Sequence, residues 1–181
     1  MTLRPVFLDT EFITTCHGPD GLISLALTDH QGTDFYAVNS DMNIAALHNN
    51  PWLLKHVWPQ LPLTPGGDLD LDHPDVRPLA DIATGAARYF STHHRQAHLH
   101  AWYAAQDVVR LHQLWDNDWA RMPEDVPRWA TDIQSLIAMA GDLVLLPTQD
   151  TPEHHALNDA RYNRDLYDYT ARELRTRGIH L

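Results

Sequence analysis

The sequence predicts an α/β fold with a mixed sheet, in which a three-stranded antiparallel meander is followed by alternating helices and strands, with helices on both faces. Two features support this prediction. The N-terminal third contains three short runs of β-forming residues separated by turn-like segments. The remainder alternates amphipathic stretches at helical spacing with short apolar stretches. With 181 residues, 44% of them hydrophobic and 20% charged, the chain fits one globular domain spanning residues 1–181.

The N-terminal part is expected to begin with the strands of the meander. They are predicted at 5–10, 21–28 and 33–39, with the turn-like segment DHQG before the last of them. Residues 43–58 carry apolar side chains at helical spacing but include Pro51, so an interrupted helix is expected there. Segment 61–74 is rich in Pro, Gly and Asp and is expected to form a loop.

The second part is expected to alternate helices with strands. Helices are predicted at 78–93, 105–116, 132–140 and 152–177, and strands at 97–103 and 127–131. Pro78 suits the first turn of its helix, because the N–H that it lacks would have no intrahelical partner there. After the meander, this order of elements is that of ribonuclease H-like folds.

Composition restricts the kind of function. The formal net charge is −11, from 24 acidic against 13 basic residues, and Lys55 is the single lysine. This balance argues against a broad basic surface for nucleic acid, but it suits an enzyme that holds phosphates through bound divalent cations. No apolar run reaches the roughly 20 residues of a membrane span, and the first residues lack the features of a secretion signal. With Cys16 as its single cysteine, the chain is expected in the cytoplasm.

Two acidic residues in the first strand are the first candidates for a site. Asp9 and Glu11 lie two residues apart, so their side chains project from the same face of the sheet. Burying both carboxylates in an apolar strand costs several kcal/mol unless a cation neutralises them, and Mg²⁺ or Mn²⁺ prefers such oxygen ligands. The alternative is a strand end that enters a solvated loop, with both acids exposed.

Asp107 and the pair His154 and Asp159 complete the candidate set. Asp107 opens an amphipathic helix directly after a strand that is expected beside the first one, although an aspartate in a first helical turn is also explained by the helix dipole. His154 and Asp159 differ by about 140° around a helix, so His154 is expected on a loop or first turn that bends back towards a site reached by Asp159. A histidine beside an attacking water suits a general base. The alternative is a surface histidine, one of 13.

These residues carry a resemblance to a known family. The D-x-E of Asp9 and Glu11, the helical Asp107, and H-x-A-x-x-D-A from His154 to Ala160 are similar to the motifs of the DEDDh exonucleases. Five longer segments resemble the bacterial polyadenylate-specific 3′-exoribonucleases called ribonuclease AS: FLDTEFI, LISLALTD, AWYAAQDVVRLHQLW, VPRWATDIQSL and HHALNDAR. The resemblance covers residues 5–170 and is weakest at 60–78.

The resemblance implies a single 3′–5′ exonuclease domain that removes mononucleotides from single-stranded RNA 3′ ends by hydrolysis, with two Mg²⁺ or Mn²⁺ ions. Its catalytic residues would be Asp9, Glu11, Asp107, Asp159 and His154. Asp9 would bridge both ions, the other three carboxylates would complete their coordination, and His154 would deprotonate the attacking water. Thr10 and Phe12 would bind substrate, although Phe12 equally suits a core aromatic. An adenylate preference and a homodimer are implied by the ribonuclease AS branch alone.

Two residues beside these motifs, His155 and Trp102, are not expected to be catalytic. His154 is taken as the base because four residues separate it from Asp159, and His155 is taken as a surface residue. Trp102 is interpreted as a core side chain.

Three other functions stay open at this point. A zinc hydrolase is suggested by the histidine pairs at 93–94, 98/100 and 154–155, of which His98 and His100 share one strand face. The chain has no H-E-x-x-H or C-x-x-C motif, however. A DNA-directed exonuclease of the same fold is compatible with every motif. A non-catalytic nucleic-acid-binding module is the third alternative.

Overall fold

The computed structural model describes residues 4–93, 97–141 and 146–179. They contain a six-stranded sheet with the order β4-β3-β2-β1-β5-β6. Its strands are β1 (Arg4–Phe12), β2 (Leu22–Asp29), β3 (Phe35–Asn39), β4 (Val76–Arg77), β5 (Ala97–Ala101) and β6 (Ala130–Asp132). The β1-β2-β3 pairs are antiparallel, whereas β3-β4, β1-β5 and β5-β6 are parallel. The sheet is therefore mixed, with β1 near its middle.

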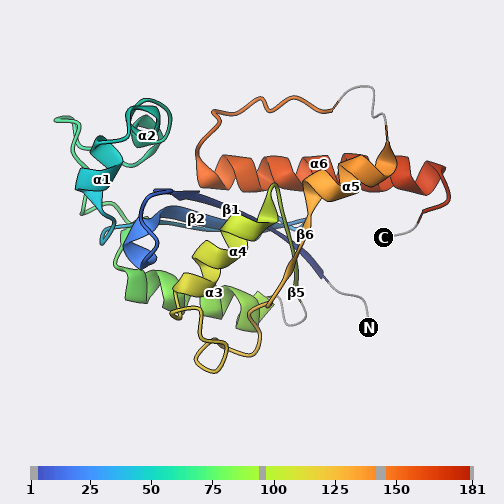
Figure 1. Ribbon diagram of the computed structural model, residues 1–181, viewed down its shortest axis with the longest axis horizontal. Helices are drawn as coiled ribbons and strands as arrows, with labels where there is room; N and C mark the ends of the chain where they lie inside the picture. The colour runs from blue at the N-terminus through green and yellow to red at the C-terminus, as the bar shows by residue number, and fades with distance from the viewer. Residues whose placement is uncertain (1–3, 94–96, 142–145, 180–181) are drawn as a thin grey trace.

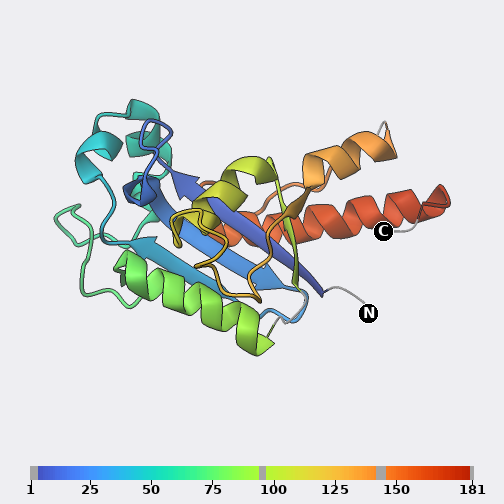
Figure 2. The same cartoon turned by 60° about the horizontal axis from the view of Figure 1, so that its bottom comes forward.

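Helices cover both faces of this sheet. They are α1 (Ile44–His48), α2 (Pro51–His56), α3 (Leu79–His93), α4 (Ala104–Gln113), α5 (Ile133–Ala140) and α6 (Ala156–Thr176). In Figure 1, α5 and α6 lie on one side of the strands and α3 and α4 on the other. The turned view in Figure 2 shows the strands between α3 and α6. The predicted fold class, a mixed sheet with an antiparallel meander and helices on both faces, is confirmed.

Alternation along β1 determines which residues reach the site. Val6 and Leu8 are fully buried in a core that includes Phe90 of α3 and Leu111 of α4. Phe7 faces the opposite way and packs with Ile133 and Leu166 of α5 and α6. Since side chains alternate between the two faces, the next odd-numbered residues of β1 also point towards the α6 side.

Several predicted boundaries were wrong for local reasons. The predicted helix at 152–177 begins only at Ala156, because His154 has a φ of 64°, which an α-helix cannot accommodate. The strand predicted at 97–103 ends at Ala101, and Tyr103 follows with a φ of 54°. Likewise, α4 ends at Gln113, ahead of two residues with positive φ, Asp116 and Asn117.

Other differences concern the interrupted helix and the smallest strands. Pro51 divides the predicted helix at 43–58, because Asn50 caps a new helix and accepts hydrogen bonds from the N–H groups of Trp52 and Leu53. The two-residue β4 follows the 61–74 loop and was not predicted. The strand predicted at 127–131 is displaced to Ala130–Asp132. Within the described ranges, the helices are all too short or too polar to cross a membrane.

Candidate metal centre

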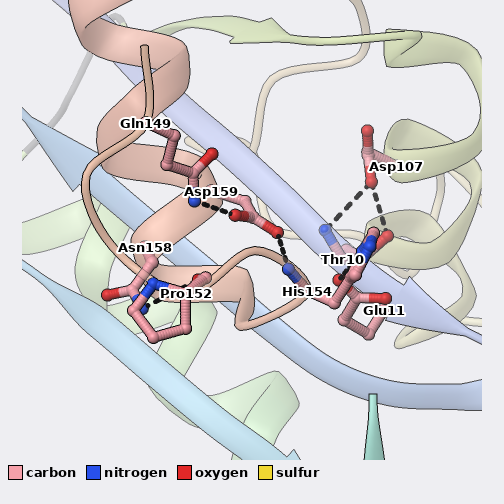
Figure 3. Close-up of polar contacts among 8 residues, drawn as sticks. All are labelled: Thr10, Glu11, Asp107, Gln149, Pro152, His154, Asn158 and Asp159. Atoms are coloured by element: carbon pink, nitrogen blue, oxygen red, sulfur yellow. Dashed lines mark hydrogen bonds and ion pairs between the residues drawn. The ribbon is translucent and has the colours of Figure 1, made fainter. Parts of the chain in front are cut away.

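The predicted metal ligands come from three elements that meet around the second half of β1. Asp9 and Glu11 lie on β1, Asp107 lies in the first turn of α4, and Asp159 lies in the first turn of α6. His154 precedes α6. One ligand atom from each of Glu11, His154 and Asp159 lies within 4.8 Å of the other two. Figure 3 shows Glu11 beside His154, with Asp107 reaching the same strand through Thr10.

Asp107 is held in place by β1 itself. Its Oδ1 accepts hydrogen bonds from the Thr10 hydroxyl at 2.6 Å and from the Thr10 backbone N–H at 3.0 Å. The start of α4 is fixed in turn, because the Ala104 N–H donates to Asp132 Oδ2 at 2.8 Å. Tyr103, with its left-handed backbone conformation, forms the sharp turn from β5 into α4. The turn therefore places Asp107 against the middle of the sheet.

Asp159 and His154 are joined through the loop before α6. The His154 backbone N–H donates to Asp159 Oδ2 at 2.8 Å, and the Gln149 amide donates to Asp159 Oδ1. His154 Nδ1 then lies 3.9 Å from Glu11 Oε1. This is the arrangement expected from the sequence, in which His154 bends back from outside the helix.

Burial and mutual repulsion disfavour ionisation of the carboxylates. Burial raises the pKa of Asp9 well above its ordinary value, and the charges of Asp107, Glu11 and Asp159 raise it further. Burial and the charges of Asp159 and Asp107 raise the pKa of Glu11 to about 8. Asp9 and Glu11 therefore experience the charges of the neighbouring carboxylates, so the site favours bound positive charge.

For Asp107 and Asp159, burial opposes ionisation while hydrogen bonds favour it. Burial raises the pKa of Asp107 to about 7, although both hydrogen bonds from Thr10 favour its ionised form. Burial also raises the pKa of Asp159, against the hydrogen bonds from Gln149 and His154. A divalent cation would remove this penalty by pairing with the ionised forms.

A cavity of about 220 Å³ opens beside these residues. It is lined by Asp9, Trp102, Gln149, Glu153, His154, Asp159, Tyr162 and Asn163. Carboxylates therefore line it together with aromatic surface and amide groups. Trp102 is half-buried, and its ring packs against the hydrophobic cluster of α5 and α6 while it also lines this cavity. The interpretation of Trp102 as a core side chain therefore describes only part of its surroundings.

The two predicted substrate-binding residues have structural contacts. Thr10 is buried, and its hydroxyl and N–H both donate to Asp107. Phe12 is half-buried with the Arg110 guanidinium 4.7 Å from its ring centre. Arg110 Nη1 donates in turn to the Cys16 carbonyl at 2.9 Å, which holds the loop after β1. Substrate binding by Thr10 and Phe12 stays a prediction.

The assignment of His155 as a surface residue was wrong. Its ring stacks on Tyr36 of β3 with centroids 4.6 Å apart, and burial lowers its pKa. The helix start therefore directs the two adjacent histidines differently, His154 towards Glu11 and His155 over the sheet.

Sequence reasoning missed several residues around the site. Gln149 and Asp132 act through hydrogen bonds to Asp159 and to the start of α4. Trp52 and His56 of α2 contact the His154 ring. Asp132, Trp52 and His56 are distant in sequence from the residues that they contact, and Gln149 lies ten residues before Asp159 outside any motif.

Of the histidine pairs behind the zinc alternative, His98 and His100 lie in a different cluster, and His94 lies outside the described residues. The His98 and His100 rings are 4.5 Å apart, and both are already engaged: His98 Nε2 with the Thr131 hydroxyl and His100 Nδ1 with the His98 carbonyl. Over the described residues, the group of potential metal ligands is Glu11, His154 and Asp159, and it does not include this pair.

Known proteins resemble this chain in structure. No protein-family model and no curated protein sequence matches it. The Mg²⁺- and Mn²⁺-bound form of Pop2p from S. pombe matches with a TM-score of 0.50 and 11% identity, over 97% of this chain and 84% of Pop2p. E. coli exonuclease I in complex with a 5cy-dA13 oligonucleotide matches with a TM-score of 0.52 and 14% identity, over 93% of this chain but 41% of exonuclease I. At these identities the likeness establishes a shared fold.

Proposed function

We propose that this protein is a metal-dependent 3′–5′ exoribonuclease that releases mononucleotides from single-stranded RNA by hydrolysis. The convergence of Asp9, Glu11, Asp107 and Asp159, with His154 at their edge, carries the proposal. Its fold is shared with exonuclease I, which was solved with an oligonucleotide, and with Pop2p, which was solved with Mg²⁺ and Mn²⁺.

The residues present fit a pair of hard divalent cations. Four carboxylates supply oxygen ligands. Burial raises the pKa of all four, and repulsion from neighbouring carboxylates adds to this for Asp9 and Glu11, so bound positive charge is favourable. We assign the four carboxylates as the residues that would hold two Mg²⁺ or Mn²⁺ ions. When bound, two such ions stabilise the attacking and leaving oxygens of an in-line phosphoryl displacement.

The chain's own groups have defined roles in this proposal. His154 takes the proton of the attacking water, and Glu11, 3.9 Å from its Nδ1, stabilises the resulting imidazolium. Asp159 fixes the backbone of His154 through the 2.8 Å hydrogen bond from its N–H. The cavity beside Asp9 accepts the 3′-terminal nucleotide, with Trp102 and Tyr162 as its aromatic walls.

The finer features of the proposal rest on the resemblance to ribonuclease AS. They are a preference for RNA, a preference for adenylate, a homodimer and a cytoplasmic location. A DNA-directed 3′–5′ exonuclease is the second candidate, favoured by the structural likeness to exonuclease I with its deoxyadenylate oligonucleotide. A non-catalytic binding module would keep the same fold and cation site without turnover.

Incubating the purified protein with 5′-labelled oligo(A), oligo(U) and oligo(dA) in Mg²⁺ or Mn²⁺ tests these candidates. We expect a ladder of products in which the oligonucleotide is shortened by one nucleotide at a time, fastest for oligo(A). EDTA and Asp9→Asn should abolish it, whereas Asp165→Asn, an exposed aspartate of α6, should not. Fastest shortening of oligo(dA) would favour the DNA enzyme. Cation binding with no shortening of any substrate would contradict catalysis.

A further inference from the structure

The short helix α2 carries two rings towards the candidate site. Figure 1 places α2 beside the N-terminal end of α6. Trp52 and His56 are four residues apart and share one face of the helix, where their rings stack with centroids 5.1 Å apart. The helix itself is anchored, because Asn50 caps its first turn and Leu53 is buried in the core with Val57.

Both rings contact the imidazole of His154. The Trp52 ring meets it edge-to-face at a centroid distance of 4.8 Å, and the His56 ring meets it at 5.7 Å and 78°. On another side, Glu11 Oε1 lies 3.9 Å from Nδ1. The imidazole is therefore bounded by two rings and a carboxylate while its backbone is held by Asp159.

The direction of the His154 side chain is not fixed by regular secondary structure. His154 lies before α6 with a φ of 64°, outside the helix. A general base must be within hydrogen-bond reach of the proton that it removes. Contacts from α2 supply the constraint that the loop lacks.

We propose that Trp52 and His56 are positioning residues that hold the His154 imidazole in the orientation needed to take the proton of the attacking water. This inference rests on the proposed function. Trp52 is 49% exposed, so a direct contact with a substrate base is the competing role. The two roles differ in which kinetic constant changes, since a positioning residue acts through His154 and a substrate contact acts through binding.

Steady-state kinetics on oligo(A) separates these roles. Positioning predicts that Trp52→Ala lowers kcat by about 10- to 100-fold, the scale of a misplacement of about 1 Å, with KM changed less than about twofold. Trp52→Phe should recover most of kcat because it keeps a ring at this position. Leu54→Ala removes an exposed apolar side chain from the same helix and should leave both constants unchanged.

A double-mutant cycle tests whether Trp52 acts through His154. In a His154→Ala background, Trp52→Ala should cause no further loss of the residual activity. A full additional loss in that background, or a loss confined to KM, would overturn the proposal and favour direct substrate contact. Matching thermal unfolding of the variants distinguishes these effects from misfolding.

Histidine NMR supplies a test that does not need turnover. The imidazole Hε1 signal of His154, assigned from its absence in His154→Ala, should be shifted by the Trp52 ring in the wild type. It should move towards the position of a solvated histidine in Trp52→Ala, and an unchanged signal would overturn the proposal. If the wild type degrades no nucleic acid, the proposed function fails, while the NMR result still decides whether α2 positions His154.

Discussion

Replacing Glu11 by glutamine should stabilise the protein when no divalent cation is bound. Glu11 is 9% exposed, and burial together with the charges of Asp159 and Asp107 raises its pKa from 4.5 to about 8. A pKa that is higher in the folded than in the unfolded state makes ionisation unfavourable for folding. The penalty is absent below pH 4.5, grows as the pH rises, and is complete above pH 8. Glutamine is neutral at every pH and does not carry it.

The size of the effect follows from the same two pKa values. At about 1.4 kcal/mol per pH unit, the interval from pH 4.5 to pH 7 corresponds to about 3 kcal/mol. One kcal/mol moves the midpoint of thermal unfolding by about 2–4 °C in a domain of this size. Glu11→Gln should therefore raise Tm by roughly 6–12 °C at pH 7 in EDTA. At about pH 4.5 the gain should nearly vanish.

Thermal unfolding of the wild type and Glu11→Gln at both pH values measures this effect. Glu124→Gln, which changes an exposed glutamate, is the matched control and should leave Tm unchanged. Saturating Mn²⁺ should reverse the order, because the wild type gains more binding free energy than a variant that lacks one ligand. A variant no more stable than the wild type at pH 7, or equally stabilised at both pH values, would refute the reasoning.

Three further predictions concern the same site. Because burial raises the pKa of Asp107 to about 7 and that of Glu11 to about 8, Mn²⁺ binding at pH 7 should release protons, and the affinity for Mn²⁺ should increase from pH 6 to pH 8. Calorimetry in buffers of different ionisation enthalpy measures the proton release. Binding of Mn²⁺ without proton release would contradict the prediction. Thr10→Val removes the hydroxyl that donates to Asp107 and should weaken Mn²⁺ binding by about 10-fold, with recovery in Thr10→Ser; an unchanged Kd would mean that the hydrogen bond does not orient the carboxylate. Gln149→Ala removes the amide donor to Asp159 and should lower kcat/KM on oligo(A) by about 10-fold at fixed Mn²⁺, whereas a rate equal to that of the wild type would exclude this role.

The architecture was predictable because it depends on periodic patterns. The alternation of Phe7, Asp9 and Glu11 along one strand placed both acids on the face opposite Val6 and Leu8, and the structure has this arrangement. Pro51 likewise indicated the interruption between α1 and α2. Such signals are local, so they can be recognised in the sequence without knowledge of tertiary contacts.

Contacts between distant segments were not predictable in this way. The start of α6 depends on His154, because its positive φ is incompatible with an α-helix. The same residue contacts Glu11 and α2, which are distant in the sequence. His155 is half-buried because it stacks on Tyr36, which lies on a strand more than a hundred residues earlier. Thr10 illustrates the same difficulty, since its role towards Asp107 depends on how α4 packs against β1. Sequence spacing indicated which carboxylates to consider but not the groups that hold them.

Anomalous diffraction from crystals soaked in Mn²⁺ tests the metal centre most directly. We expect two peaks among the carboxylates of Asp9, Glu11, Asp107 and Asp159, both lost in Asp9→Asn crystals soaked in the same way. The absence of any peak at these side chains, or Mn²⁺ bound only at other acidic residues, would contradict the assignment of this site as the metal centre.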